Sequence, residues 1–510
     1  MTLAFGSETL DYKAGTSHFA YIGATGSGKT VLIRLLMQSV LFTAATRNIS
    51  TRLLVYDSKR EMMPILHGIF NNLERQDAAR KIKLINPLDK RGVAWNMAED
   101  ITEPVHAQEL ASILVPDEPN TKEPFYPNAA RLIIESVILS FITESPRQWT
   151  FRDVCLAVET QATIEQVLCR PSPAHTSWVP KALFGDDRTT ANILATLAAA
   201  MRPYRIIAAL WDKAKERISL HEWLRSHDQI LVLGNSPTSR TAIDAINQVI
   251  FKRLSQIILE EQPEIKPEGD LQRVWIFLDE FVRAGRLNGA VELATEGRSK
   301  GVCFVTGFQD INGLRAVYGR EVGEEIIGQC TNIALLRMQS PDSAEWASTL
   351  IGDYRGVDEI VNRSVNHGDG GMQTSFNYQF AERRSVLASH FRQLPPVRKP
   401  SERDKRDEGQ GIHGVFYSPF LSADTVNEWH IEYDWLFSEG NLWDKDETIK
   451  GYERVTETKH QYLEQWGPRD FVKLKLSPGE KKKEPEPRTK DDGGDSIKDA
   501  FRQQGFEIDE

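Results

Sequence analysis

The segment Gly23–Thr30, which reads GATGSGKT, restricts the fold of this chain more than any other part of its sequence. Its glycines let successive backbone N–H groups point into one concave loop, and the positive end of a following helix also attracts phosphate. A strand is expected before the motif and an amphipathic helix after it, as a P-loop requires. We therefore predict a site for ATP and Mg²⁺, against the alternative of a chance match.

Each position of this motif has an expected role. Lys29 is placed to reach the β- and γ-phosphates, and Thr30 offers a hydroxyl to Mg²⁺ at the first helical turn. The residues expected to bind the nucleotide are Gly23, Ala24, Thr25, Gly26, Ser27, Gly28, Lys29 and Thr30.

A second part of the site is expected where the apolar run Val274–Leu278 ends in Asp279 and Glu280. Asp279 would hold the Mg²⁺ shell together with Thr30. Glu280, beside it, suits the polarisation of a water that attacks the γ-phosphate. The alternative is a surface strand end that is acidic by chance.

Two further residues are candidates for catalysis beside Lys29 and Glu280. Gln309 follows the run Val302–Thr306, and polar side chains at the carboxyl ends of parallel strands lie where ligands bind. Its amide would contact the γ-phosphate or the attacking water, unless it is a loop glutamine with other partners. Arg298 is the candidate for a positive charge in the transition state, with an ordinary surface arginine as the alternative.

Short apolar runs rich in β-branched and aromatic residues predict the strands of an α/β fold. Most are apolar throughout, which is typical of a parallel sheet covered by helices on both faces. The expected strands are His18–Ile22, Arg52–Tyr56, Lys81–Ile85, Gln229–Leu233, Val274–Leu278, Val302–Thr306 and Asn332–Met338.

The block 97–217 interrupts this pattern with helical spacing and helix-start signals. Capping boxes are predicted at Thr150–Asp153 and Thr163–Gln166, and a third at Ser219–Glu222 marks the return to the α/β pattern. We therefore predict an all-helical domain inserted into the α/β core.

A chain of 510 residues exceeds the size of one ordinary domain. We expect a nucleotide-binding domain in two parts, 1–96 and 218–421, the inserted all-α domain 97–217, and a C-terminal extension 422–476. The tail 477–510 is mostly Lys, Glu, Asp, Pro and Gly, so we expect disorder there. Ile497 and Phe501 stand at i, i+4 spacing in this tail and suggest a docking helix, against the alternative of a solubilising end.

The net charge of −10 argues against a surface that is basic everywhere, although a basic channel would still be compatible with DNA. The four cysteines form no CxxC pair, so we expect buried free thiols in a reducing compartment. We expect no membrane helix, because no stretch approaches the roughly 18 apolar residues that one needs; the best is Leu35–Thr46. We expect a cytoplasmic chain without a signal peptide.

The order of these motifs resembles the type IV secretion coupling proteins, the TraD and TrwB kind of DNA-dependent ATPase in bacterial conjugation. The matching segments run over most of the chain. They are Gly23–Thr30, Val55–Lys59, Asn86–Asp89 with Trp95-Asn96, Trp275–Phe281, Glu296–Gly301 with Gly307–Gln309, Asn332–Arg337, Ser343-Ala344 and Leu350–Gly352.

This resemblance implies a RecA-like domain in a homo-hexameric ring that passes DNA, single-stranded or bound to a relaxase, towards type IV secretion components. It also implies that Arg298 acts across the subunit interface and that Gln309 senses the γ-phosphate. Members usually begin with a membrane-spanning segment, whereas here the P-loop lies about twenty residues from Met1. Either that segment was trimmed or this member is naturally soluble, peripheral at the inner face of the cell membrane.

Two other functions stay open at this point. One is a cytosolic DNA translocase of the FtsK and HerA kind, and the other is a receptor or scaffold that uses ATP as a switch to present effector proteins. The expected helical insertion and the segment 296–309 favour a coupling protein over a translocase of the first kind. The intact Lys29, Asp279 and Glu280 count against a protein without hydrolysis.

Overall fold

The structure is a computed structural model that describes residues 2–116, 125–237, 239–265, 271–365, 372–397, 411–421, 426–437, 440–457 and 462–477. Residues 478–510, which form almost all of the tail expected to be disordered, lie outside the described residues. The docking helix suggested in this tail lies outside them too.

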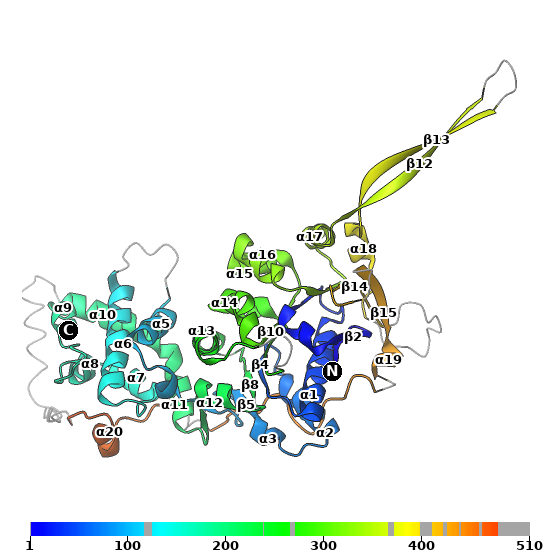
Figure 1. Cartoon of the computed structure of the whole chain (residues 1–510). Helices are drawn as coiled ribbons and strands as arrows, with labels where there is room; N and C mark the ends of the chain where they lie inside the picture. The colour runs from blue at the N-terminus through cyan, green and yellow to red at the C-terminus, as the bar shows by residue number, and fades with distance from the viewer. Residues whose placement is uncertain are drawn as a thin grey trace, which may run out of the picture.

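A nine-stranded sheet forms the centre of the molecule, in the order β15-β14-β11-β3-β10-β9-β4-β8-β5 (Figure 1). The strands from β11 to β5 are parallel, and β14 and β15 add an antiparallel edge. All seven predicted strands are present, so the α/β prediction is confirmed. Their bounds are β3 Phe19–Ile22, β4 Thr51–Tyr56, β5 Ile82–Ile85, β8 Ile230–Leu233, β9 Arg273–Leu278, β10 Val302–Phe308 and β11 Asn332–Leu336, followed by β14 Gly411–Tyr417 and β15 Val426–Glu432.

Both faces of this sheet are buried, because successive side chains of each strand enter two different cores. In β9, Ile276 packs into one core and Phe277 into the other. The helices α1 (Lys29–Arg47) and α2 (Met62–Asn72) cover one face. The other face is covered by α13 (Arg240–Glu261), α14 (Ala290–Thr295), α15 (Ile311–Tyr318) and α16 (Arg320–Gly328).

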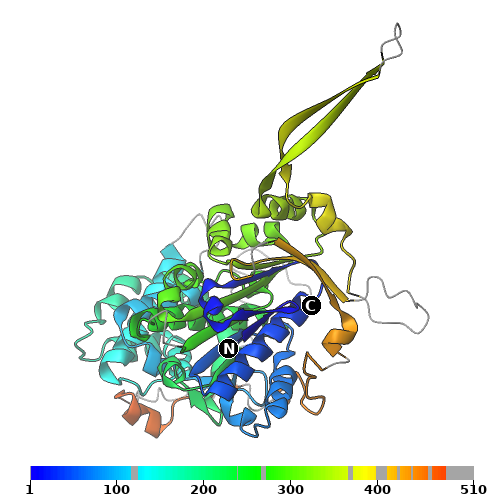
Figure 2. The ribbon, with the colours of Figure 1, turned by 45° about the vertical axis from the view of Figure 1, so that its right-hand side comes forward.

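The block 97–217 folds as a group of helices on one side of the sheet (Figures 1 and 2). Its one described strand, β7 (Arg217–Ile218), pairs with β6 (Ala94–Trp95) at the boundary. The helices are α4 (Met97–Asp100), α5 (Pro104–Leu114), α6 (Phe125–Glu144), α7 (Phe151–Ala157), α8 (Gln161–Leu168), α9 (Trp178–Leu183), α10 (Asp187–Met201), η2 (Arg202–Tyr204) and α11 (Arg205–Asp212).

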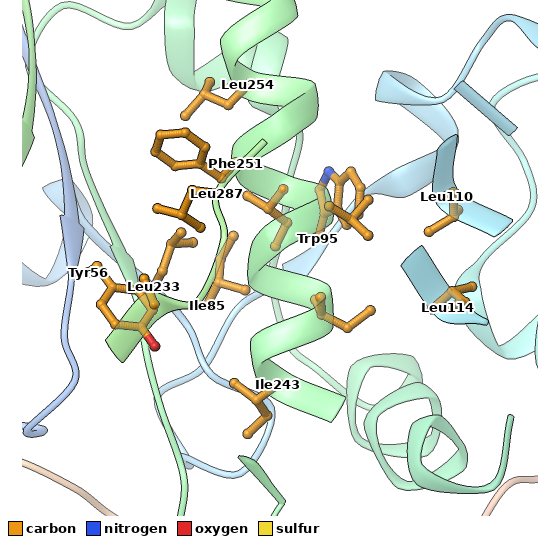
Figure 3. Packing of buried hydrophobic residues seen from close by; sticks show 14 of the residues in the cluster. Tyr56, Ile85, Trp95, Leu110, Leu114, Leu233, Ile243, Phe251, Leu254 and Leu287 are labelled. Carbon is orange, nitrogen blue, oxygen red and sulfur yellow. The ribbon is translucent and has the colours of Figure 1, made fainter. Parts of the chain in front are cut away.

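This helical group shares a core with the sheet, with α13 between them. In Figure 3, Phe251 of α13 lies with the sheet residues Leu233 and Ile85, whereas Trp95 lies on the side facing α5, where Leu110 and Leu114 stand. The group is therefore packed against the sheet through buried apolar side chains, and is not held by its two connections alone.

The helix-start predictions hold at two of three places. The Thr150 hydroxyl accepts from the N–H of Asp153, whose carboxylate accepts from the Thr150 N–H. Ser219 caps α12 (Leu220–Arg225) and accepts from the Glu222 N–H. The start predicted at Thr163 is wrong, because Thr160 is the cap and Thr163 is the third residue inside α8. Two threonines at this spacing offer the same local signal, and α8 begins at the earlier one.

The structure contains elements that the sequence analysis did not predict. A hairpin of β12 (Asp353–Val365) and β13 (Met372–Arg384) extends far from the body of the molecule (Figures 1 and 2). Its described side chains include Phe376, Tyr378 and Phe380, which are more than half exposed. A second, short hairpin pairs β1 (Thr2–Phe5) with β2 (Glu8–Asp11) at the start of the chain.

The C-terminal extension is tied to the rest of the fold at both ends. Its strand β15 belongs to the main sheet, so that sheet continues beyond residue 421, where we expected the domain to end. Further on, the Trp443 N–H donates to Gln38 of α1, and Trp466 donates its ring N–H to Asp153 of the helical group. The extension therefore runs along the molecule from the sheet to the helical group.

Two expectations about composition need correction. Three helical segments are long and apolar enough to cross a membrane, namely Lys29–Arg47, Phe125–Glu144 and Asp187–Asp212. Between 44% and 61% of their apolar windows is buried inside the protein, and α1 packs directly on the sheet. Of the cysteines, Cys155, Cys303 and Cys330 are buried free thiols as expected, but Cys169, the residue that caps the end of α8, is exposed.

Candidate nucleotide-binding site

The loop Gly23–Thr30 joins β3 to α1 and takes a shape that only glycine allows at several positions. Gly26 and Gly28 have φ angles of 77° and 96°, in the left-handed region. A Cβ on Gly28 would also lie 2.6 Å from the side chain of Ile412, and one on Gly23 would lie 2.6 Å from the Ser27 hydroxyl. The loop therefore keeps a cradle of about 340 Å³ in front of the helix amino terminus, lined by residues 24–31.

The parallel register brings the other candidates to the same edge of the sheet. Phe308 of β10 pairs with Ile22 of β3, and Thr306 of β10 pairs with Leu278 of β9. The loop after β3, the acidic pair after β9 and Gln309 after β10 therefore meet at one point.

Direct contacts link these residues. Thr30 donates its hydroxyl proton to Asp279 Oδ2 at 2.8 Å, and Lys29 Nζ lies 3.7 Å from Glu280 Oε1. Asp279 and Glu280 are 6% and 5% exposed, so both carboxylates are largely removed from water. Burial lowers the pKa of Lys29, and the nearby carboxylates of Glu280 and Asp279 act in the opposite direction.

Gln309 connects the acidic pair to the phosphate loop. Its amide nitrogen donates to Glu280 Oε1 at 3.1 Å, and its amide oxygen accepts from the Thr25 hydroxyl at 3.1 Å. A ligand that contacts the loop through Thr25 would therefore disturb the amide that holds Glu280. Five of the predicted side chains come together here: Lys29, Thr30, Asp279, Glu280 and Gln309.

Arg298 is the predicted residue that does not join them. It lies in η4 (Gly297–Lys300), before the amino end of β10, whereas Gln309 follows the carboxyl end of the same strand. Seven residues of strand separate the two ends by about 20 Å, so Arg298 stands at the opposite edge of the sheet from its own phosphate loop. There it is exposed and lines a cavity of about 810 Å³ with Lys13 and Phe420.

A buried histidine ties the Arg298 segment to the sheet. His18 accepts from the Phe304 N–H through Nδ1 at 3.1 Å, and its Nε2 lies 2.9 Å from the Ala294 carbonyl oxygen, to which the neutral ring donates. Burial lowers the pKa of His18 to about 4, and the nearby charge of Arg298 acts in the same direction. The neutral ring therefore fixes the end of α14, four residues before Arg298.

The structure adds two residues that the sequence analysis had given no role. Lys59, after the carboxyl end of β4, places Nζ 3.2 Å from Asp279 Oδ2 and 3.1 Å from the Thr30 hydroxyl. Burial lowers the pKa of Lys59, but the carboxylates of Asp279 and Glu280 outweigh it, so the pKa is raised overall. Arg283, three residues after Glu280, also lines the cradle. The sequence signal for Lys59 was its position just after the predicted strand Arg52–Tyr56. We find no such signal for Arg283.

The residues present fit a magnesium ion with a nucleotide. Asp279 Oδ1 and the Ser27 hydroxyl are buried and have no hydrogen-bond partner among the described residues. A buried acceptor without a partner is costly unless a ligand satisfies it. The hydroxyl of Thr30 and the carboxylate of Asp279 are oxygen ligands of the kind that Mg²⁺ prefers.

Two comparisons of the sequence with known proteins give matches. The family described as the type IV secretion-system coupling protein DNA-binding domain matches residues 2–399. The coupling protein TraD of Escherichia coli (strain K12) is 23% identical over 344 residues, which are 66% of this chain and 44% of TraD. The chain thus spans less than half the length of this curated relative.

Solved structures of the plasmid coupling protein TrwB share the fold. The unbound monoclinic form of TrwBdeltaN70 is 15% identical with a TM-score of 0.59, covering 89% of this chain and 91% of that one. TrwB in complex with a non-hydrolysable ATP analogue is 17% identical, again with a TM-score of 0.59, over 89% and 92%. TrwB with ADP and Mg²⁺ is also 17% identical with the same score, over 89% and 91%. Since the family match extends over residues 2–399, which are most of this chain, the chain belongs to the type IV secretion-system coupling proteins.

Proposed function

We propose that this chain is an ATPase that uses hydrolysis to feed DNA, alone or bound to protein, into a type IV secretion channel. The observation that carries the proposal is the joining of Lys29, Thr30, Asp279, Glu280 and Gln309 around one cradle. The family adds the substrate class, because the matching domain is described as DNA-binding.

The side chains of this cradle have distinct roles in the proposed reaction. The loop Gly23–Thr30 binds the phosphates through backbone N–H groups, and Lys29 neutralises charge on them. Thr30 and Asp279 would hold Mg²⁺, which would supply further positive charge next to the phosphates. The relatives crystallised with an ATP analogue and with ADP and Mg²⁺ support these two ligands.

Glu280 acts as the base that orients and activates the attacking water. Its carboxylate is buried and held by the amide of Gln309, so it has one preferred direction. Since the same amide accepts from Thr25, Gln309 links the state of the phosphate loop to the position of the base. This link is the basis for the proposed role of Gln309 as a sensor of the γ-phosphate.

Arg298 completes the site of a neighbouring copy in a ring. Its distance from its own cradle excludes direct contact there, since an arginine side chain is far shorter than the roughly 20 Å length of β10. A ring interface joins two different faces of the same chain, so the Arg298 face of one copy meets the cradle of the next. A homo-hexamer at the inner face of the cell membrane, with DNA and secretion components as partners, fits this arrangement.

Hydrolysis with and without single-stranded DNA tests the proposed function. We expect DNA to stimulate the ATPase of the unchanged chain, because an enzyme that moves DNA couples its hydrolysis cycle to the bound strand. Lys29→Ala should abolish hydrolysis, whereas Glu280→Gln should bind ATP normally and turn it over at least about a hundredfold more slowly.

The control is Lys215→Met, which removes an exposed lysine outside the cradle. Hydrolysis that DNA leaves unchanged would favour a receptor that uses ATP as a switch. Normal turnover by Glu280→Gln would remove Glu280 from the role of base.

A further inference from the structure

The ammonium group of Lys59 lies between the two oxygen atoms assigned to the magnesium shell. Its Nζ donates to the Thr30 hydroxyl oxygen at 3.1 Å and to Asp279 Oδ2 at 3.2 Å, and lies 3.6 Å from Glu280 Oε1. The two oxygens themselves are 2.8 Å apart. A single positive charge therefore bridges both candidate ligands.

The two lysines of the cradle differ in their freedom to move. The side chain of Lys29 is 5% exposed and stands at the first turn of α1, whereas that of Lys59 is 33% exposed and stands in a loop. That loop is closed by Asp57, whose carboxylate accepts from the backbone N–H groups of Glu61 and Met62 at 3.0 Å each. Lys59 thus has a fixed backbone and a flexible side chain with a route to solvent.

An ammonium and a magnesium ion on the same oxygen repel each other. Magnesium binds oxygen at about 2.0–2.1 Å, so an ion on the Thr30 hydroxyl would stand within a few ångströms of an ammonium that lies 3.1 Å from that oxygen. In a site largely removed from water, charges of the same sign at this separation repel strongly. Binding of Mg²⁺ therefore favours withdrawal of the Lys59 side chain.

We propose that Lys59 is a positioning residue that holds the place of Mg²⁺ while the site is empty and withdraws when Mg²⁺ and nucleotide bind. The inference rests on the nucleotide binding proposed above. In the empty site Lys59 offsets the charge of two buried carboxylates and keeps Thr30 and Asp279 in position. Because the ammonium repels the incoming ion, Lys59 also raises the concentration of Mg²⁺ that nucleotide binding requires.

The test measures ADP binding to the full chain by calorimetry over a series of Mg²⁺ concentrations, including EDTA. In Lys59→Met the ammonium is lost and the length of the side chain is kept. We expect the Mg²⁺ concentration for half-maximal enhancement of ADP affinity to fall roughly fivefold to tenfold, because no ammonium then repels the ion. The matched control Lys215→Met should leave this concentration unchanged.

Thermal unfolding supplies a second measurement. Without nucleotide, Lys59→Met should melt below the unchanged chain, since two buried carboxylates lose a counter-charge. With saturating Mg²⁺ and ADP the difference should disappear. In an Asp279→Asn background, Lys59→Met should shift the Mg²⁺ dependence much less, whereas a purely structural role would leave its effect intact. If Lys59→Met does not fold, Lys59→Gln takes its place.

An unchanged Mg²⁺ dependence in a folded Lys59 variant would overturn the inference. So would a failure of the unchanged chain to bind ADP at all, since the site itself would then be misassigned. ADP binding requires neither hydrolysis nor DNA, so a chain without DNA-stimulated hydrolysis still tests Lys59. Conversely, normal DNA-stimulated hydrolysis together with an unchanged Mg²⁺ dependence would refute the role proposed for Lys59 and leave the proposed function standing.

Discussion

Arg298 offers the sharpest test of how copies of this chain cooperate. Arg298→Ala removes the charge that should reach a neighbouring cradle, and Lys29→Ala disables the cradle itself. Each variant alone should hydrolyse almost no ATP. The exposed Arg80 supplies the matched arginine, and Arg80→Ala should keep normal hydrolysis.

The expected recovery in a mixture follows from the separation of the two residues. A working site needs the intact cradle of an Arg298→Ala chain and the intact arginine of an adjacent Lys29→Ala chain. In a random equimolar ring each requirement is met half the time, so about one quarter of the interfaces are complete. Hydrolysis should therefore return to about one quarter of the normal rate if the sites act independently.

The assay is ATP hydrolysis with single-stranded DNA present, by mixed rings purified through two different affinity tags. A mixture of Lys29→Ala with the double variant Lys29→Ala/Arg298→Ala is the control, since no interface there has an intact cradle. No recovery in purified mixed rings would refute action between subunits. Arg298 would then have a role other than contact with a phosphate, since its own cradle lies across the length of β10.

The remaining predictions concern stability and partners. His18 should make the protein less stable below neutral pH: its pKa of about 4 lies below the value of about 6.5 of the unfolded chain, so the stability it contributes is complete above pH 6.5 and is lost as the pH falls. At pH 5 the contribution of His18 should be lower than at neutral pH by about 2 kcal/mol, so the loss of stability measured by urea unfolding should be smaller by about this amount in His18→Gln; an equal pH dependence in both proteins would contradict it. Replacing residues 356–381 by a two-residue turn should change the melting temperature by less than about 3 °C, because the hairpin arms pair with each other; loss of folding would show that they support the body. Deleting residues 491–510 should leave DNA-stimulated hydrolysis normal and reduce substrate transfer in cells; unchanged transfer would count against docking by the tail.

Local sequence determined the parallel core and the contents of the cradle. Most of the seven predicted strands are apolar on both faces, and a segment of this kind has few alternatives to the centre of a covered parallel sheet. The P-loop and the acidic pair after β9 were visible because their chemistry depends on glycine conformation and on strand ends, which neighbours in sequence define. Parallel strands bring such ends to one edge of the sheet, so the sequence predicted that Glu280 and Gln309 lie near each other. The hydrogen bond between them is seen only in the structure.

Tertiary structure alone decided the features that depend on residues distant in sequence. The hairpin β12–β13 mixes apolar, charged and glycine residues, and its pairing becomes apparent only when the two arms meet. The bridging position of Lys59 depends on β4 lying beside β9, which the order of the strands in the chain does not reveal. Likewise, Arg298 and Gln309 are near in sequence but lie at opposite edges of the sheet, because a strand joins them. Sequence spacing specifies which atoms are available, whereas packing and strand order specify which of them come within a few ångströms of each other.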